Sequence, residues 1–336
     1  MQQRSLGPFT VSAIGLGCMN FCHAYGAPVS EAQAQRVLLA SLDAGVTHFD
    51  TATLYGFGQS ELLLGKYLMA HRQRFTLASK CGIHAVTGPD GKKMRAIDGR
   101  PATLRQNCED SLKRLNTEVI DLYYLHRWDK TVPIEESVGA LGDLVKAGKI
   151  RAVGLSEVSA ATLRKAHAEF PISAVQSEYS LWTRNPEMAV LQACAQLGVA
   201  LVAFSPVARG FLTSAPPEPA LFDATDFRKN MPRFAVDAYA ANRQLLPSFT
   251  RLAQEAGCTP AQLAIAWLLH QAPHVLPIPG TTSVAHALEN AAAAQKVLTP
   301  ETLAACEALI NSQTVQGNRY PDQAHSEVDT EEIPGT

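Results

Sequence analysis

The stretch His48-Phe49-Asp50-Thr51-Ala52-Thr53-Leu54-Tyr55-Gly56 joins an apolar strand pattern to a turn that carries two polar groups. The strand pattern, which starts at Val46, breaks at Asp50, and a phenol, Tyr55, follows five residues later. An acid at the end of a buried strand with a phenol close behind it is an unusual combination for structure alone. At the mouth of a parallel barrel, both side chains would lie where the active sites of such barrels form.

Similar apolar runs recur along the chain and alternate with helical patterns. Most of these runs are continuously apolar, as parallel strands covered by helices are. Together with the first one they give eight predicted strands, at residues 13–17, 47–50, 76–80, 120–126, 150–156, 174–178, 200–206 and 275–280.

Amphipathic helical patterns separate the predicted strands. The first covers residues 31–44, with Ser30 as its N-cap, Gln33 at its third position and Gly45 at its end. The others cover residues 60–70, 102–115, 135–147, 160–169, 187–197, 240–256, 260–270, 283–294 and 300–312.

This alternation, with no linker or repeat, predicts an α/β fold in which residues 1–336 form a single (β/α)8 TIM barrel. Residues 3–18 show a strand–turn–strand pattern around Gly7-Pro8, which predicts an N-terminal β-hairpin across the bottom of the barrel. A doubly wound sheet is the alternative. Against it, Gly15 and Gly17 are not followed by the third glycine of the dinucleotide-binding fingerprint.

Three stretches are predicted to be loops. Residues 82–100 are rich in Gly, Lys and Asp, residues 213–234 hold several prolines, and residues 313–336 form a polar tail. The first two follow strand ends, so we expect them to lie at the carboxyl face of the barrel as lids, with the tail and the extra helices nearby.

Composition excludes several classes of protein. Apolar residues make up 46% and charged residues 18% of the 336, and the formal net charge is -2, which gives no reason to expect nucleic acid or an anionic membrane as partner. No apolar run is long enough to span a membrane, and the first residues lack a signal-peptide pattern. The seven cysteines contain no C-x-x-C pair, so we expect reduced thiols, no metal site and a cytoplasmic location.

Four residues at predicted strand ends suggest a reaction. Asp50, Lys80 and His126 end three successive strands, and Tyr55 lies on the loop after the first. A phenol is a poor acid near neutrality, but a neighbouring ammonium favours its ionised form, and a carboxylate keeps that ammonium charged and placed. A histidine opposite can stabilise negative charge on a carbonyl oxygen. These roles suit proton transfer to a carbonyl as a hydride arrives.

Each of these residues also has a plain structural interpretation. Tyr55 beside a glycine is usually a packing residue, and a lysine such as Lys80 usually reaches solvent. His126 taken alone fits a core histidine, and Asp50 fits a cap of the following turn. The plain interpretations require four separate coincidences at neighbouring strand ends. We therefore favour the catalytic interpretation, which explains all four residues together.

Ordered motifs along almost the whole chain resemble those of the aldo-keto reductase family. They are FDTATLYG at 49–56, LASK at 77–80, DLYYLHR at 121–127, GLSE at 154–157, QSEYSLW at 176–182, FSPVARGFL at 204–212 and PIPGTT at 277–282. GLSE and QSEYSLW are most similar to the branch that contains perakine reductase, auxin-induced-protein-like reductases and bacterial relatives. The resemblance implies a catalytic tetrad of Asp50, Tyr55, Lys80 and His126, with Tyr55 as general acid.

The resemblance also implies an extended nicotinamide dinucleotide across the barrel mouth. By position, Ser156 and Gln176 would hold the nicotinamide carboxamide, and Tyr179 would lie near its ring. Glu157 stands where many members have Asn, and its role is left open. The loop from Ser205 to Leu212, with Pro206, Arg209 and Gly210, would cradle the diphosphate. At the adenine end the expected contacts are Gly280, Thr281, Thr282, Ser283, His286, Glu289 and Asn290.

Ser283 departs from the family pattern, in which a Lys or Arg at this position pairs with the 2′-phosphate of NADP. Helix N-terminal groups and His286 offer some compensation. A charge-assisted bond contributes on the order of 1.5–3 kcal/mol, so its absence weakens discrimination against NAD. The resemblance implies NADP(H) as the preferred cofactor, with NAD(H) as the alternative.

The substrate is expected to be a small carbonyl compound or alcohol with a hydrophobic part. The predicted contacts are Met19, Asn20, Phe21 and Tyr25 after the first strand and Trp128 after His126, although Phe21 and Trp128 fit loop packing equally well. An NADPH-dependent carbonyl reductase is the first hypothesis. The alternatives are an NAD-dependent alcohol or sugar dehydrogenase and a nucleotide-sensing regulatory protein similar to potassium-channel β subunits. The sequence does not predict the oligomeric state.

Overall fold

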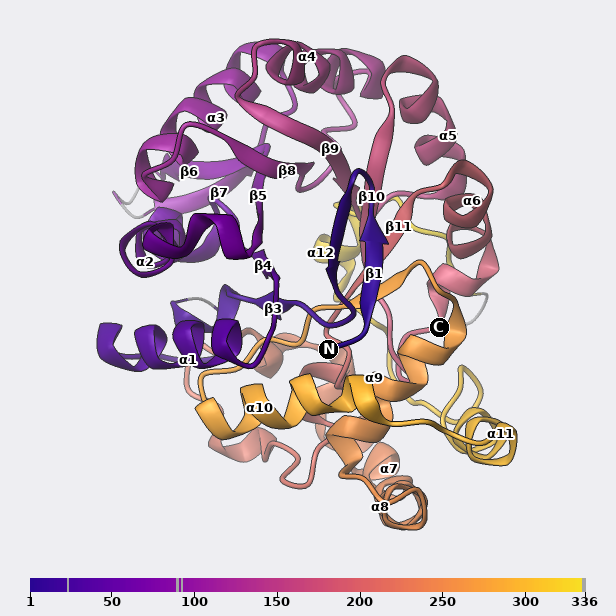
Figure 1. Ribbon diagram of the computed structural model, residues 1–336. Helices are drawn as coiled ribbons and strands as arrows, with labels where there is room; N and C mark the ends of the chain where they lie inside the picture. Colours follow the sequence, from indigo (N-terminus) through magenta and orange to yellow (C-terminus); the bar gives the residue numbers. More distant parts are fainter. Residues whose placement is uncertain (23, 89–90, 92, 334–336) are drawn as a thin grey trace.

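A barrel of eight parallel strands forms the centre of the molecule (Figure 1). The computed structural model describes residues 1–22, 24–88, 91 and 93–333. The strands are β3 (Leu16–Gly17), β4 (His48–Asp50), β5 (Thr76–Cys81), β8 (Ile120–Leu125), β9 (Ile150–Ser156), β10 (Ile172–Glu178), β11 (Ala200–Phe204) and β12 (Val275–Pro277), and they pair in this order. All eight predicted strands are confirmed, and so is the (β/α)8 fold.

Hydrogen bonds between the first and last strands close the sheet. The N–H of Gly15 donates to Pro277 O at 3.0 Å, and the N–H of Gly17 donates to Pro279 O at 3.2 Å. A side chain at Gly17 would place its Cβ 2.9 Å from the carbonyl oxygen of Ile278, so this seam requires glycine. The closed sheet leaves no edge strand exposed.

Helices surround the barrel on its outside (Figure 1). The ring consists of α1 (Glu31–Asp43), α2 (Gln59–Tyr67), α3 (Pro101–Leu115), α4 (Ile134–Lys146), α5 (Ala160–Glu169), α6 (Val190–Leu197), α9 (Pro260–Gln271) and α10 (Val284–Ala292), with α7 (Val236–Arg243), α8 (Leu246–Glu255), α11 (Pro300–Leu309) and α12 (Asp322–Ser326) beside it. The Ser30 side chain accepts the N–H of Gln33, as the predicted N-cap of α1 requires. No helix among the described residues is long and apolar enough to cross a membrane.

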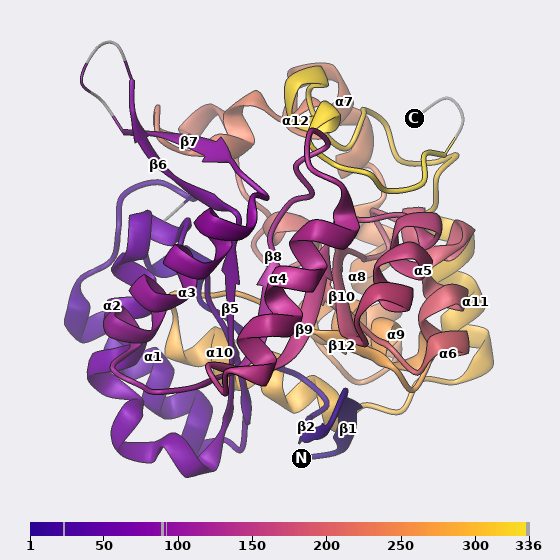
Figure 2. The ribbon, with the colours of Figure 1, turned by 90° about the horizontal axis from the view of Figure 1, so that it is seen from above.

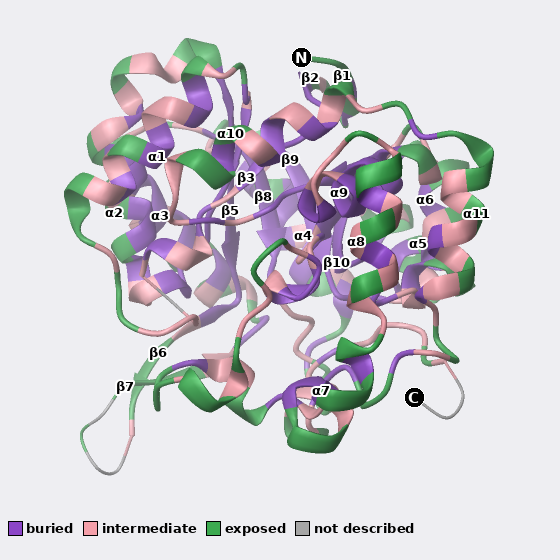
Figure 3. Cartoon of the chain, turned by 90° about the horizontal axis from the view of Figure 1, so that it is seen from below, coloured by how far each residue is buried: buried purple, intermediate pink, exposed green. Residues whose placement is uncertain are grey.

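Apolar side chains fill two layers of the core, which appear buried in Figure 3. Successive residues of a strand alternate between them: Leu77 faces the helices, whereas Ala78 faces the barrel interior. The interior is tightly filled, since a Cβ on Gly154 would lie 2.3 Å from the ring of Tyr124. The barrel interior is therefore a packed core, and the active sites of such barrels lie at the carboxyl end of the strands.

The N-terminal hairpin, β1 (Gln3–Leu6) with β2 (Phe9–Ser12), covers the bottom of the barrel, as predicted. Its Leu6 and Val11 side chains belong to the interior apolar layer. Its Arg4 side chain is buried, and it donates to Ala272 O at 2.7 Å, to Val275 O at 2.5 Å and to Leu269 O. These carbonyls lie at and beyond the end of α9, where a helix leaves its acceptors unsatisfied.

Three predicted segments differ from the structure. Residues 82–100 are not simply a loop, because β6 (Ile83–Thr87) and β7 (Lys93–Ile97) form an antiparallel hairpin there. Residues 240–256 are not one helix: the chain breaks between α7 and α8, where Pro247 occupies the first turn of α8. The predicted tail contains the short helix α12. In Figure 2 the β6–β7 hairpin, α7 and α12 lie at the end of the barrel opposite to β1 and β2.

We predict that Arg4→Met lowers the free energy of unfolding by about 1.5–3 kcal/mol, the range for hydrogen bonds that involve a charged group. Three carbonyl acceptors near the end of α9 lose their donor in this variant. Urea unfolding measures the change, and Lys146→Met, on an exposed helix surface, serves as control. Equal unfolding midpoints for the Arg4 variant and wild type would contradict the role given to Arg4.

Candidate active site

A cavity of about 740 Å³ lies at the carboxyl end of the barrel strands. Its walls come from the strand ends, from the loops after β3, β4 and β11, from the N-terminal part of α10 and from the C-terminal tail. Among its lining residues are Asp50, Tyr55, His126, Ser156, Gln176, Arg209, Thr281, Asn290 and Tyr320. Segments from nearly every part of the sequence therefore meet at one hollow.

Asp50, Lys80 and Tyr55 are in direct contact on the cavity floor. The Lys80 ammonium donates to Asp50 Oδ1, to the Thr51 carbonyl oxygen at 2.8 Å and to the Tyr55 hydroxyl oxygen at 3.1 Å. Lys80 and Asp50 are each only 1% exposed. Although burial works against its charge, Asp50 and Tyr55 raise the pKa of Lys80, so the lysine stays an ammonium.

Tyr55 keeps its proton in this environment. Burial raises the pKa of its phenol above the ordinary value, and the positive charges of Lys80 and Arg127 only partly oppose this effect. The neighbouring lysine alone would lower the pKa, as expected from the sequence, but burial makes the larger contribution. A neutral phenol is a hydrogen-bond donor, and the adjacent Lys80 ammonium would stabilise the phenolate if the proton were transferred.

His126 lies across from Tyr55, at the end of β8. The two rings meet edge to face with their centroids 5.9 Å apart. The backbone N–H of His126 donates to Cys81 O at 2.9 Å, which continues the barrel pairing beyond β8 and fixes the residue. The structure thus brings all four predicted tetrad residues together.

Arg127 was missing from the predicted site although it follows His126 in the sequence. Its guanidinium donates to the His126 carbonyl oxygen at 2.7 Å and to Ser156 Oγ at 3.1 Å, and it lines the cavity. A half-buried cation beside the tetrad adds positive potential where negative charge would develop on a substrate oxygen. The only signal in the sequence was a charged residue directly after a strand-end histidine.

Ser156 and Gln176 line the cavity on neighbouring strands, where the expected nicotinamide contacts should lie. The amide of Gln176 donates to Asp50 Oδ2 at 2.8 Å, so it also holds the carboxylate of the tetrad. Tyr179 differs from expectation. It is fully buried outside the cavity, donates to Glu187 at 2.8 Å and packs edge-on against Trp267.

The loop after β11 has the backbone of an anion cradle. Ser205, Ala208, Arg209 and Gly210 all have positive φ, between 52° and 95°. Turns with such φ angles form concave nests that bind phosphate groups in other proteins. Here the N–H groups of Ala208 and Gly210 also donate within the loop, to Ser205 O at 2.9 Å and to Val207 O at 3.1 Å. Ser205, Pro206, Arg209 and Gly210 line the cavity, whereas Leu212 is buried behind the loop.

At the far end of the cavity lies the start of α10. The expected contacts Gly280, Thr281, Thr282, His286, Glu289 and Asn290 line this end. Ser283 does not line it; its side chain caps α10 by accepting the N–H of His286 at 3.4 Å.

A cation from α1 lies close to the start of α10. The Gln33 amide donates to Thr282 O at 2.6 Å, and the exposed Arg36 guanidinium donates to the Gln33 side chain. Arg36 is thus two hydrogen bonds away from the loop that leads into α10. Spacing in the sequence gave no sign of this proximity, because residues 36 and 282 are far apart along the chain.

Comparisons with known proteins show the family of this chain. The model of the aldo/keto reductase family matches residues 13–311. The chain belongs to the aldo/keto reductase family. It is 41% identical over 319 residues to a probable aldo-keto reductase of Glycine max, covering 93% of this chain and 89% of that one. The family assignment makes the chain an oxidoreductase.

Two solved structures show the same fold. The glycerol dehydrogenase from Gluconobacter oxydans is 29% identical, with a TM-score of 0.81, and the match covers 95% of this chain and 97% of that chain. An aldo-keto reductase from Klebsiella pneumoniae, solved in complex with NADPH, is 28% identical, with a TM-score of 0.71, and the match covers 96% and 99% of the two chains.

Three of the five residues that were predicted to contact substrate line the cavity, namely Met19, Asn20 and Tyr25. Phe21 is 1% exposed within the core, and Trp128 packs against the core with its indole N–H donating to Val132 O at 2.9 Å. Both aromatic residues therefore follow the loop-packing interpretation.

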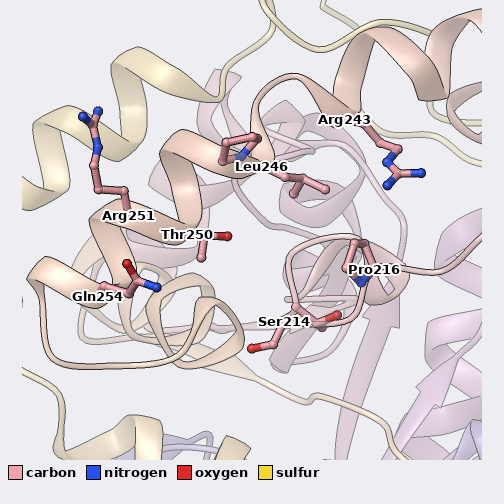
Figure 4. A pocket seen from close by; sticks show the side chains of 9 residues that line it. Ser214, Pro216, Arg243, Leu246, Thr250, Arg251 and Gln254 are labelled. Carbon is pink, nitrogen blue, oxygen red and sulfur yellow. The ribbon is translucent and has the colours of Figure 1, made fainter.

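A smaller hollow of about 380 Å³ lies between the 213–216 loop and α8. Figure 4 shows the guanidinium groups of Arg243 and Arg251 at opposite ends of it. Each arginine is also paired with a carboxylate, Arg243 with Glu218 and Arg251 with Glu255. The two cations do not converge on a common point. In the described part of the chain, no group of three or more His, Cys, Asp or Glu residues is placed to hold a metal ion.

We predict that Lys80→Met lowers the free energy of unfolding by about 3–5 kcal/mol, because it leaves Asp50 as a buried and uncompensated charge. Thermal or urea unfolding measures the effect. The double variant Lys80→Met/Asp50→Asn should recover most of the loss, since both charges are gone. A single variant as stable as wild type would show that the pair is not held as the structure describes.

Proposed function

We propose that the chain reduces small aldehydes and ketones to alcohols with NADPH, and that Tyr55 is the general acid. The contact of the Tyr55 hydroxyl with the buried Lys80 ammonium, at 3.1 Å on the cavity floor, carries this proposal. A proton donor held by a cation at the base of a partly apolar cavity suits proton delivery to a carbonyl oxygen. The family assignment supports the same chemistry.

The cavity fits a nicotinamide dinucleotide. The nest of Ser205, Ala208, Arg209 and Gly210 would hold the diphosphate, and Ser156 and Gln176 would hold the carboxamide. Glu289 and Asn290 would contact the adenine. When bound, the reduced dinucleotide supplies the hydride that adds to the carbonyl carbon.

The chain's own residues would handle the proton and the charge. Tyr55 donates its proton to the carbonyl oxygen as negative charge develops there, and it regains a proton from solvent afterwards. Lys80 stabilises the resulting phenolate, and Asp50 keeps Lys80 charged and in place. His126 and Arg127 supply positive potential at the same oxygen.

The NADPH complex of the Klebsiella pneumoniae relative supports NADPH as the cofactor. Arg36, placed beside the start of α10, supports it as well, because a cation there favours the 2′-phosphate. The likeness to a glycerol dehydrogenase supports the reverse reaction, alcohol oxidation, as the second candidate. Both directions use the same tetrad.

We further propose that residues 1–336 form one barrel domain with residues 313–336 as its tail, and that the enzyme is cytosolic. All seven cysteines are free thiols, in agreement with a reducing compartment. The proposed partners are small carbonyl compounds or alcohols. We propose no partner among nucleic acids or membranes.

Tyr55→Phe tests the proposed general acid. We expect kcat to fall by at least about 100-fold, the lower range for general acid catalysis, because the transferable proton is gone while the ring remains. NADPH affinity, followed by fluorescence titration, should stay close to wild type.

The outcomes of this test separate the candidate functions. Near-normal turnover by the Tyr55→Phe variant would refute the tetrad assignment. Wild-type protein that binds NADPH tightly but turns over every carbonyl tested very slowly would favour the regulatory alternative.

Ser283→Arg tests whether position 283 faces the 2′-phosphate of NADP. The variant should raise the preference for NADPH over NADH by at least about tenfold, because a charge-assisted bond contributes about 1.5–3 kcal/mol. Ser283→Ala is the matched control, since it removes the same helix cap without adding charge. Unchanged dissociation constants for both dinucleotides in the arginine variant would show that position 283 does not face the phosphate.

A further inference from the structure

Two buried carboxylates lie side by side at the barrel mouth, outside the tetrad. Glu157 follows the end of β9 and is 1% exposed, while Glu178 is the last residue of β10 and is 3% exposed. Glu157 Oε1 accepts the backbone N–H of Glu178 at 3.0 Å, so the two residues are directly joined. Two negative charges this close and this far from water require cations as partners.

One partner comes from the C-terminal tail. Arg319 donates to Glu178 Oε2 from Nε at 2.9 Å and to Glu157 Oε2 from Nη2, so its planar fork joins both carboxylates. The following tail residues continue along the end of β9, where Asp329 N–H donates to Glu157 O at 3.0 Å. We call residues 319–331 the strap.

Acidic side chains hold the end of the strap at the start of α5. Asp329 accepts from the Ser159 N–H at 3.2 Å and from its hydroxyl at 3.1 Å, and Glu331 accepts the Ala160 N–H at 2.7 Å. Negative groups are favourable at a helix N-terminus. The strap is therefore fixed along its length and is not a loose end.

The other partner belongs to the diphosphate loop. Arg209 donates to the same oxygen of Glu178, Oε2, at 2.8 Å. Arg209 lines the cavity, whereas Arg319 does not. Arg209 and Arg319 thus share Glu178, one from the cofactor side and one from the strap side.

Docking of the strap supplies Glu157 with its bonded cation, Arg319. Burial opposes ionisation of Glu178, but the charges of Arg209, Arg319 and Arg233 lower its pKa to about 2. Arg233 acts from a distance, because its guanidinium donates to oxygens of other residues. Without Arg319, Glu157 loses its bonded cation, and the charge next to the diphosphate loop becomes more negative by one unit.

We propose that Arg319 is a positioning residue through which strap docking and dinucleotide binding stabilise each other. By neutralising Glu157 and Glu178, it leaves the charge of Arg209 available to the diphosphate. Coupling between two binding events is reciprocal, so a bound dinucleotide also holds the strap closed. Tyr320, Pro321, Ala324 and Glu327 of the strap line the cavity, and closure therefore shapes the substrate wall as well. The inference rests on the proposed function in requiring a dinucleotide in this cavity.

Two variants with opposite predicted effects test the charge argument, with NADPH as the probe. Arg319→Met removes the cation and should raise the dissociation constant of NADPH by about tenfold, the size expected for one uncompensated charge nearby. Glu157→Gln removes a carboxylate and should lower the dissociation constant of NADPH by a few-fold. It does so although, like Arg319→Met, it breaks the ion pair between Arg319 and Glu157. A purely structural role would weaken binding in both variants.

A double variant and a control on the strap complete the experiment. Arg319→Met/Glu157→Gln restores the balance of charge and should return the dissociation constant to within about threefold of wild type. Lys130→Met loses strap contacts to Ser326 O at 3.0 Å and Val328 O at 2.9 Å but leaves the carboxylate cluster intact, so it should raise the constant by less than Arg319→Met does.

Hydrogen exchange of residues 319–331 gives a second readout that does not depend on activity. Bound NADPH should slow this exchange in wild type and much less in Arg319→Met. Equal NADPH affinity in wild type and Arg319→Met, weaker binding by Glu157→Gln, or no recovery in the double variant would each overturn the coupling. Failure of wild-type protein to bind any nicotinamide dinucleotide would instead overturn the proposed function.

Discussion

The buried contact between Lys80 and Asp50 is the interaction on which the barrel mouth depends. An ammonium is stable in a packed interior only with a carboxylate and further acceptors around it, and Asp50, Thr51 O and Tyr55 supply them. Because these groups come from β4, β5 and the loop after β4, the pair fixes neighbouring strand ends relative to one another. Gln176 extends this arrangement across the barrel by donating to the same Asp50. The Lys80–Asp50 ion pair thus underlies both the proposed chemistry and the local rigidity.

Much of the fold could be predicted from the sequence because its signals are local and repeated. Continuous apolar runs gave all eight strands, and Ser30 with Gln33 gave the start of α1. The tetrad followed from a topological rule: the carboxyl ends of parallel strands meet at one face. The β6–β7 hairpin was not predicted because its strands are short and mostly exposed, so no buried apolar face distinguishes them from a loop.

The rest of the site depends on side-chain directions and distant contacts, which no local pattern encodes. Tyr179, Phe21 and Trp128 lie on the correct segments but point into the core. Arg36 and Arg319 lie beside the residues that line the cavity, on segments with no motif and across long separations in the sequence. Burial at Tyr55 reverses the direction of the pKa shift that the neighbouring lysine alone would give, since burial is a property of the whole packed mouth.

The position of Arg319 near the end of the chain has a consequence for biosynthesis. The eight strands and the helices around them are complete by Leu309, before the ribosome has made Arg319. Until then, in the described part of the chain, Glu178 has Arg209 as its bonded cation and Glu157 has none. A buried carboxylate without a bonded cation is costly, so the barrel mouth is less stable at that stage. A chain that stops before Arg319 would therefore keep its barrel strands but lose the ion pairs that join the strap to Glu157 and Glu178.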